Sequence, residues 1–332
     1  FSEAVKGNFS AEALTLFDSV SGSNSVTLTG WNFTADPTPS PGEKPYLQAN
    51  SSDHVTAWLS AADITAIKSN GHIGTAKSNT FLSISSVLPF TYNEDTQSVG
   101  SPLQIVPIIP SKALQVTTFT PDAVNPSLTG YDIDKDSGVL TLRFNEPVEL
   151  KTFNQSGLVI QQQSERGTGT KFVNLGSDSI VTRTDHLGFV GGDTVVVTLG
   201  TSDLGKVLSL DLGAYLTMTS STARDMADAN NPVVAIPDGS AIAATTIVPD
   251  STGPSVVSFG LDLQLGVLTI TFSEPIDGDT FDPTKFSIQG ANKKNVTGVY
   301  NLTTASVITS NVGETIEVDM NIFRTDLDGI KA

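Results

Sequence analysis

Three aspartates stand at alternate positions in one short stretch, and they form the clearest pattern for a metal ion in this sequence. Asp132, Asp134 and Asp136 lie in YDIDKDSG, where a loop can bring their carboxylate oxygens together on calcium. The glycine comes one residue later than an EF-hand loop requires, and no glutamate follows at the twelfth position. Calcium is therefore the one cofactor that the sequence suggests. A solvated turn ahead of a strand is the simpler explanation.

Residues for catalysis are sparse. The three histidines, His54, His72 and His186, lie in polar, turn-like contexts, and no cysteine is present. The sequence also lacks the HExxH, GxSxG and glycine-rich phosphate-loop patterns. Acidic residues are plentiful enough for a glycosidase-type carboxylate pair, but a repeated module with divergent loops is a poor host for one active site. We expect no enzyme activity in this segment.

Asparagine sequons point to the cell exterior, because N-linked glycans are added to exported chains. Six asparagines head an Asn-X-Ser/Thr triplet without proline at X: Asn8, Asn32, Asn50, Asn154, Asn295 and Asn301. Asn154 and Asn301 have the most turn-like or polar surroundings, so we expect them to carry glycans first.

Charge and hydropathy narrow the classes of partner. The net charge is -17 and the pI is about 4.3. Such a chain repels the phosphates of nucleic acids and anionic lipids. No apolar run approaches the ~20 residues that cross a bilayer, and the first ten residues do not resemble a signal peptide. We expect a soluble, mature segment that binds no nucleic acid.

A repeat organises the chain. VLTLRFNEPV at 139–148 matches VLTITFSEPI at 267–276, an offset of 128 residues that also relates Pro121 to Pro249 and Phe153 to Phe281. The opening phrase FSEAV is a third copy. Each copy later carries an Asp-headed phrase, and these phrases are DITAIK from Asp63, DLGKVL from Asp203 and DLDGIK from Asp326.

The first copy opens directly on its Phe-x-Glu phrase, whereas the other two reach it through a Pro-Asp boundary, a short strand and a glycine turn. We expect that the chain starts inside a module and that the third copy stops about 50 residues early. The open sheet edges would then be completed by the same polypeptide, which we prefer, or by strands from a neighbouring chain.

The secondary structure is predicted to be β. Leu140, Leu142 and Phe144 alternate with polar residues, the period of a strand with one buried face. The Asp-headed phrases predict one or two helical turns, with Ser202 or Asp203 as the N-cap in the second copy. Proline lacks an N–H, so Pro147 and Pro275 are expected where the strand leaves its ladder. The glutamates before them, Glu146 and Glu274, are expected to bond the adjoining turn.

The phrase G-x-L-T-L-x-F-x-E-P-V, followed by T-F-x and an Asp-headed segment, resembles the immunoglobulin-like modules of large repetitive surface proteins. These include bacterial surface-layer and adhesin-type chains and giant extracellular proteins of algae and other protists. The resemblance implies tandem two-sheet sandwiches placed end to end, and it says almost nothing about a ligand. The phrase ARDMADANNPV at 223–233 is close to the D-x-x-G-N phrase of such modules, with asparagine in place of glycine.

We therefore predict an all-β chain of three immunoglobulin-like modules, at 1–119, 120–247 and 248–332. The junctions TPDAVNPS and VPDSTGPS are each bounded by prolines, which favours extended, semi-rigid linkers. The predicted function is a structural extracellular glycoprotein whose modules bind copies of themselves or their neighbours in a surface filament, hair or sheath. A cell-surface adhesin or carbohydrate-binding array, with the modules as its stalk, is the alternative. An enzyme whose catalytic domain lies outside this segment is a third possibility.

Overall fold

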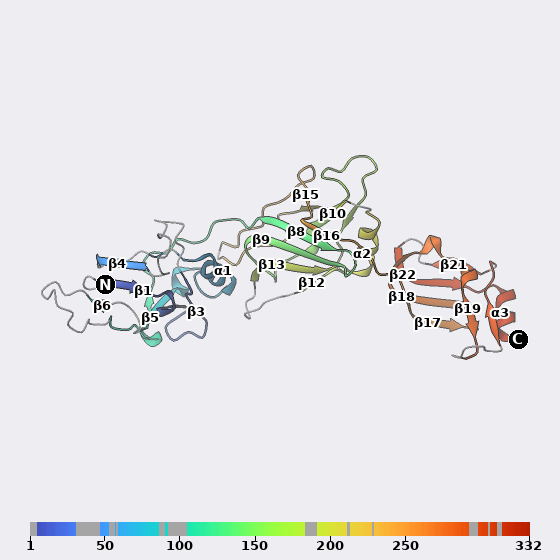
Figure 1. The fold of residues 1–332 in the computed structure, drawn as a ribbon, viewed down its shortest axis with the longest axis horizontal. Coiled ribbons are helices and arrows are strands. Elements are labelled where there is room, and N and C mark those ends of the chain that lie inside the picture. Colours follow the sequence, from blue (N-terminus) through green and yellow to red (C-terminus); the bar gives the residue numbers. More distant parts are fainter. Residues whose placement is uncertain are drawn as a thin grey trace.

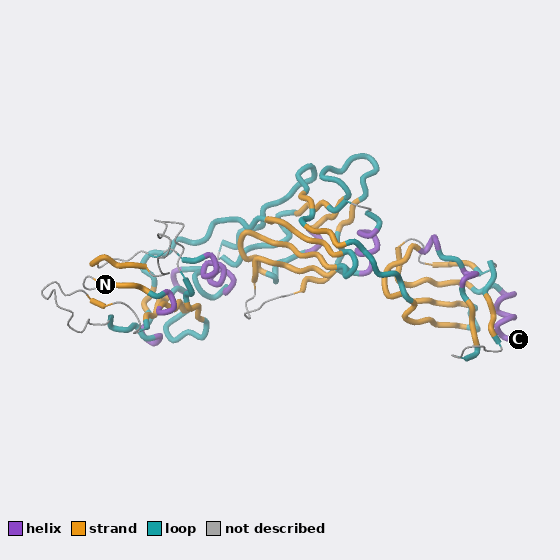
Figure 2. The backbone as a smooth tube through the Cα atoms, in the orientation of Figure 1, coloured by secondary structure: helices purple, strands orange, loops and turns teal. Residues whose placement is uncertain are grey.

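The structure is a computed structural model of the 332-residue chain. It describes residues 5–30, 47–52, 57, 59–85, 90–91, 105–182, 191–210, 213–227, 229–291, 298–304, 306–310 and 314–332. The chain is mostly β, with several sheets and few helices. Three groups of strands lie in a row along the longest axis, and we call them the first, second and third modules after the predicted ranges (Figures 1 and 2).

The second module contains two sheets. The larger sheet has the order β12 (Ile180–Thr182), β13 (Gly191–Thr198), β9 (Val139–Glu149), β8 (Leu128–Asp134) and β16 (Thr246–Val248). The smaller sheet has the order β11 (Phe172–Asn174), β10 (Leu158–Gln161), β14 (Tyr215–Met218) and β15 (Ile242–Ala243). The pair β16 and β8 is parallel, and every other pair in these two sheets is antiparallel.

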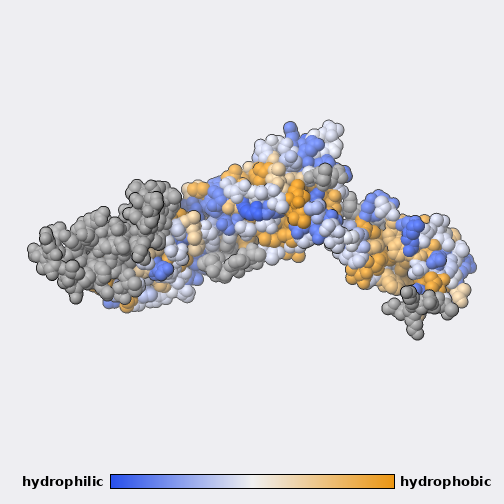
Figure 3. All heavy atoms as spheres, viewed as in Figure 1, coloured by the Kyte–Doolittle hydropathy of each residue, from blue (hydrophilic) through white to orange (hydrophobic). Residues whose placement is uncertain are grey.

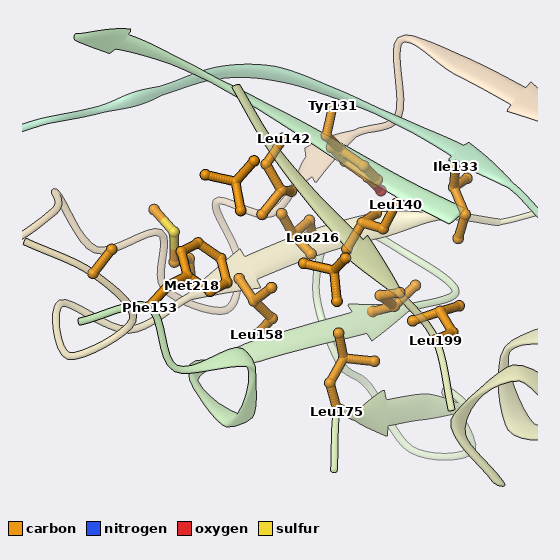
Figure 4. Close-up of a cluster of buried hydrophobic side chains, with 14 of the residues drawn as sticks. Tyr131, Ile133, Leu140, Leu142, Phe153, Leu158, Leu175, Leu199, Leu216 and Met218 are labelled. Carbon is orange, nitrogen blue, oxygen red and sulfur yellow. The ribbon is translucent and has the colours of Figure 1, made fainter. Parts of the chain in front are cut away.

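One hydrophobic core joins these two sheets. Leu140 and Leu142 of β9 are fully buried and Phe144 is 5% exposed, which confirms the predicted alternation. They meet Leu158 of β10 and Leu216 of β14 from the opposite sheet (Figure 4). Each such side chain contributes roughly 1.5 to 3 kcal/mol by leaving water, so this shared core holds the two sheets together.

The first module has a smaller described core. Its sheets have the orders β4 (Leu47–Ser52), β1 (Val5–Phe9) and β6 (Phe90–Thr91), and β3 (Ser25–Thr27), β2 (Leu14–Phe17), β5 (Phe81–Ile84) and β7 (Leu114–Gln115). Its buried cluster includes Ala11, Ala13, Leu28, Ile84 and Ile105.

The third module repeats the larger sheet of the second. Its order is β17 (Val256–Asp262), β18 (Val267–Asp277), β22 (Glu314–Asn321) and β21 (Val307–Ser310), beside the pair β19 (Ser287–Gln289) and β20 (Val299–Asn301). Among the described residues, no strand pairs with the outer edge of β17 as β16 pairs with β8. Phe259 is 66% exposed, whereas Tyr131, at the same place in the repeat, is fully buried in the core of the second module. Figure 3 shows apolar surface, in orange, on this module.

Short helices complete the described chain. The α-helices are α1 (Ala61–Asn70), α2 (Thr201–Leu208) and α3 (Arg324–Lys331). The 3₁₀ turns are η1 (Ala11–Ala13), η2 (Lys77–Asn79), η3 (Pro110–Lys112), η4 (Gln155–Gly157), η5 (Gly278–Thr280) and η6 (Pro283–Lys285). None of the helices in the described ranges is long and apolar enough to span a bilayer.

The Phe-x-Glu-Pro phrase breaks the ladder in the second and third modules. Arg143 pairs with Thr194, but the next paired residue of β9 is Val148, opposite Gly192. In the third module, Thr271 pairs with Glu317 and the next pair is Ile276 with Thr315. Because proline offers no N–H, these breaks suit Pro147 and Pro275. Both strands resume pairing at the residue after the proline, so the prolines lie at an irregularity within an inner strand and not, as predicted, where the strand leaves its ladder.

Candidate functional site: the joints between modules

The three Asp-headed phrases form the α-helices, and two of these helices touch the next module. α1 contacts β9 and β13, and α2 contacts β18 and β22, the matching strands of the third module. The first and second modules therefore each present their helix to the Phe-x-Glu-Pro strand of the module that follows (Figure 1). The repeat in sequence thus appears again as a repeated joint.

A buried aspartate fixes each helix within its own module. Asp63 is 1% exposed, and its carboxylate accepts the backbone N–H groups of Thr29 (2.8 Å) and Gly30 (3.1 Å). Asp203 is 2% exposed and accepts the Gly176 N–H (2.6 Å) and the Ser179 hydroxyl (2.7 Å). These bonds tie the helix to a loop that lies far away in the sequence.

Asp326 plays the same part in the third module. It is fully buried and accepts hydrogen bonds from the Ser306 hydroxyl (2.6 Å), the Tyr300 hydroxyl (3.0 Å) and the Thr303 N–H (3.1 Å). Burial raises the pKa of Asp326, but these hydrogen bonds outweigh burial, so its pKa lies below the usual value. The carboxylate is held in its charged form.

The predicted N-cap of α2 was wrong. The N-cap of α2 is Gly200, and neither Ser202 nor Asp203 takes that position. Asp203 lies inside the helix, and its carboxylate is occupied by Gly176 and Ser179. A local propensity rule could not reveal these distant partners.

At the first joint, one lysine of the first module lies between two carboxylates. The Lys68 ammonium on α1 is 2.8 Å from Asp122 Oδ2 in the linker, and it also donates to Glu146 Oε2 on β9. The exposed side-chain fractions are 28% for Lys68, 20% for Asp122 and 5% for Glu146. The glutamate of FNEPV is therefore covered at the joint. The expectation that it bonds the adjoining turn was wrong, because its described partner is this lysine.

The pKa directions at this joint favour an ion pair. Burial lowers the pKa of Lys68, but hydrogen bonds to Asp122 and Glu146 and their charges raise it above the ordinary lysine value. Burial raises the pKa of Asp122, but Lys68 and the Val124 N–H bring it below the usual range. The pKa of Glu146 is raised, mainly because the group is buried.

The linker is also bonded to the second module. The side-chain amide of Asn231 donates to the backbone carbonyl of Asp122 (3.3 Å), and the Val234 N–H donates to the Pro126 carbonyl (2.7 Å). Asn231 is oriented by Asp225, which is 2% exposed and accepts both its N–H (2.7 Å) and its side-chain amide (2.7 Å). The loop of ARDMADANNPV is therefore part of the joint, a role that the sequence had left open.

The second joint uses a different aspartate. Asp136, in the turn after β8, accepts the Ser251 N–H (2.8 Å), the Ser251 hydroxyl (3.1 Å) and the Thr252 N–H (2.9 Å). The second linker is thereby bound to the second module. Gly138, which closes the turn, has φ of 69°, and Gly266 at the same place in the repeat has φ of 72°. A left-handed conformation favours glycine, which explains why both copies have it.

Glu274, the counterpart of Glu146, has a different environment. Its Oε1 is buried and has no hydrogen-bond partner in the described chain, as is also true of Glu146 Oε1, but its surrounding charges differ. Burial raises the pKa of Glu274, and the carboxylates of Asp250 and Asp136 raise it further. Glu274 and Asp136 line a cavity of about 280 Å³ between the second and third modules.

The structure separates the predicted calcium ligands. Asp132 forms an ion pair with Arg143, Asp134 accepts the N–H groups of Asp136 and Ser137, and Asp136 faces the linker. Among the described residues, no group of three histidine or acidic side chains is arranged to hold a metal ion. Calcium binding at this turn stays a prediction, and a solvated turn stays the simpler explanation.

Four of the six sequon asparagines lie among the described residues. Asn154 is exposed at the start of η4, and Asn301 is exposed in β20 opposite Ser287. Asn8 and Asn50 lie in the paired strands β1 and β4. Asn32 and Asn295 lie outside the described residues, as do His54 and His186. Glycan occupancy and the absence of enzyme activity both stay predictions.

Comparisons with known proteins place few limits on the chain. It matches no protein-family model and no curated protein. Among the solved structures that match is the crystal structure of the N-terminal part of the bacterial S-layer protein SbsC, at 15% identity and a TM-score of 0.23. The match covers 60% of this chain and 44% of the other, so the chain spans less than half of that structure. We base no argument on a likeness of this size.

Proposed function

We propose that this chain is a structural segment of an extracellular surface glycoprotein. Its tandem immunoglobulin-like modules join end to end and build a filament, hair or sheath, and their partners are neighbouring modules and other copies of the chain. The two sheets around one core in the second module support the module type. The three groups of strands in a row support the end-to-end arrangement (Figure 1).

The contact between Lys68 and Glu146 is the observation that carries this proposal. A glutamate with only 5% of its side chain exposed would be costly to bury without a positive partner. The partner comes from the preceding module, so the joint has a preferred geometry. A joint that holds two modules in one orientation suits an extended structural segment better than a loose string of domains.

The extracellular location rests on the sequons and on the exposed positions of Asn154 and Asn301. It also agrees with the net charge of -17, which keeps such a chain away from nucleic acids.

Electron microscopy of native material, labelled with an antibody against the second module, tests the proposal. Antibody decoration along filaments, hairs or a surface sheath is the expected result. Label on a single discrete particle would overturn the structural function. Label confined to attachment sites, together with binding of a glycan, would favour the adhesin. Antibody that has been absorbed with the recombinant chain serves as the control.

A further inference from the structure

The two joints repeat the same architecture but differ in charge. At the first joint, the positive charge of Lys68 lies between the negative charges of Glu146 and Asp122. At the second joint, Glu274 and Asp250 take the places of Glu146 and Asp122, since each pair is 128 residues apart. The charges that act on Glu274 there are the carboxylates of Asp250 and Asp136.

The helix of the second joint does not supply a matching cation. Lys68 follows Asp63 by five residues, and the residue five positions after Asp203 is Leu208. The α2 residues that line the cavity beside Glu274 are Thr201 and Leu204, and β22 contributes Ile316. None of these side chains can balance a carboxylate.

The hydrogen bonds of the second linker join it to each neighbouring module separately and do not join the two modules to each other. Asp136 holds Ser251 and Thr252 on the second module, and on the other side Ser255 bonds Ser273 of the third. At the first joint, by contrast, Lys68 reaches past the linker to Glu146 in the neighbouring module. At each joint the glutamate has one buried oxygen, Oε1, without a hydrogen-bond partner among the described residues. At the first joint the other oxygen accepts from Lys68, whereas at the second joint a cavity of about 280 Å³ lies beside the glutamate.

We propose that the second joint is a hinge. The first two modules move as one body, and the third rotates about residues 249–255, where the negative charges of Asp136, Asp250 and Glu274 oppose closure of the joint. The inference concerns the joints alone and does not depend on which surface structure the chain builds.

Salt separates the two joints, because screening weakens attraction and repulsion alike. The chain has no cysteine, so pairs of engineered cysteines can carry spin labels for pulsed distance measurements. Thr27→Cys with Thr182→Cys spans the first joint, and Thr182→Cys with Ser287→Cys spans the second. We expect a broader distance distribution at the second joint in low salt. Added salt should narrow it and should broaden the distribution at the first.

Charge substitutions test the cause. Thr201→Lys places a cation in the cavity, and Glu274→Gln removes one negative charge. Both should narrow the distance distribution at the second joint and slow proteolytic cleavage within 249–255 by about two- to fivefold, the range of a partly exposed ion pair. Gln163→Lys, in an exposed loop after β10, makes the same change in net charge outside the cavity and should alter neither measurement.

Distance distributions of equal width at the two joints, or a salt response in the same direction at both, would overturn the proposal. So would unchanged cleavage in Thr201→Lys and Glu274→Gln, provided that their circular dichroism and melting temperature match those of the unmodified chain. Failure to find filaments in native material would leave these outcomes unaffected, so the two proposals can fail separately.

Discussion

Lys68 and Glu146 are 78 residues apart in the sequence, yet the ammonium of the first module donates to the buried carboxylate of the second. Removing the lysine leaves that carboxylate without its cation. We expect Lys68→Ala to destabilise the docked joint by about 1 to 2 kcal/mol, less than for a fully buried pair because Lys68 is partly exposed.

A double-mutant cycle measures this contact. Glu146→Gln combined with Lys68→Ala should cost less than the sum of the two single changes. Lys77→Ala removes a lysine that bonds the Thr117 carbonyl and is the matched control. Additive effects of Lys68 and Glu146 on urea unfolding would contradict a direct coupling.

The first joint should weaken at both extremes of pH. Docking lowers the pKa of Asp122 from 3.8, so its contribution is present above that value and is lost as pH falls through the lowered pKa. Docking raises the pKa of Lys68 from 10.5, so its contribution is present below that value and is lost as pH rises through the raised pKa. The raised pKa of Glu146 works against the acid loss. Spin-label distances across the joint, followed from pH 2 to 12, should broaden at both ends. A flat profile would argue against the ion pair.

Asp203 should be a major determinant of stability in the second module. Asp203→Asn keeps the shape but loses a charged acceptor for the Gly176 N–H and the Ser179 hydroxyl, so we expect a loss of about 1.5 to 3 kcal/mol. Urea unfolding measures the change. Asp193→Asn, at an exposed position on β13, should alter stability by less than about 0.5 kcal/mol. Equal effects of the two substitutions would contradict a stabilising role for the buried hydrogen bonds of Asp203.

Asp136→Ala should release the second linker whether or not calcium is present. It removes an acceptor for Ser251 and Thr252, so cleavage within 249–255 should accelerate. Because Asp132 and Asp136 face different partners, we expect micromolar calcium to leave the melting temperature unchanged. A rise in melting temperature that Asp134→Asn abolishes would establish the calcium site instead.

Glycopeptide mass spectrometry of native material should find Asn154 and Asn301 modified. Both are exposed, and Asn154 begins a short surface turn. Treatment with a peptide N-glycosidase provides the control, because it hydrolyses the side-chain amide, converts an occupied asparagine to aspartate and shifts its mass. Two unmodified asparagines would count against an exported chain.

The sequence alone predicted the strands and the helical phrases of this chain. Leu140, Leu142 and Phe144 alternate on β9 because a strand turns successive side chains to opposite faces, a property that depends only on local spacing. The repeat then predicted that 267–276 would take the same form, and β18 confirms it. Gly138 and Pro147 likewise follow from backbone constraints within their own residues.

Only the tertiary structure decided what the polar residues of the joints do. Glu146 pairs with a lysine 78 positions earlier, and Asp203 binds a loop 24 to 27 positions earlier, so no local pattern names either partner. The same limit explains why three aspartates at alternate positions suggested one calcium site, whereas the fold turns them to an arginine, a turn and a linker. A carboxylate can satisfy many kinds of donor, and which one it meets depends on the packing of whole modules.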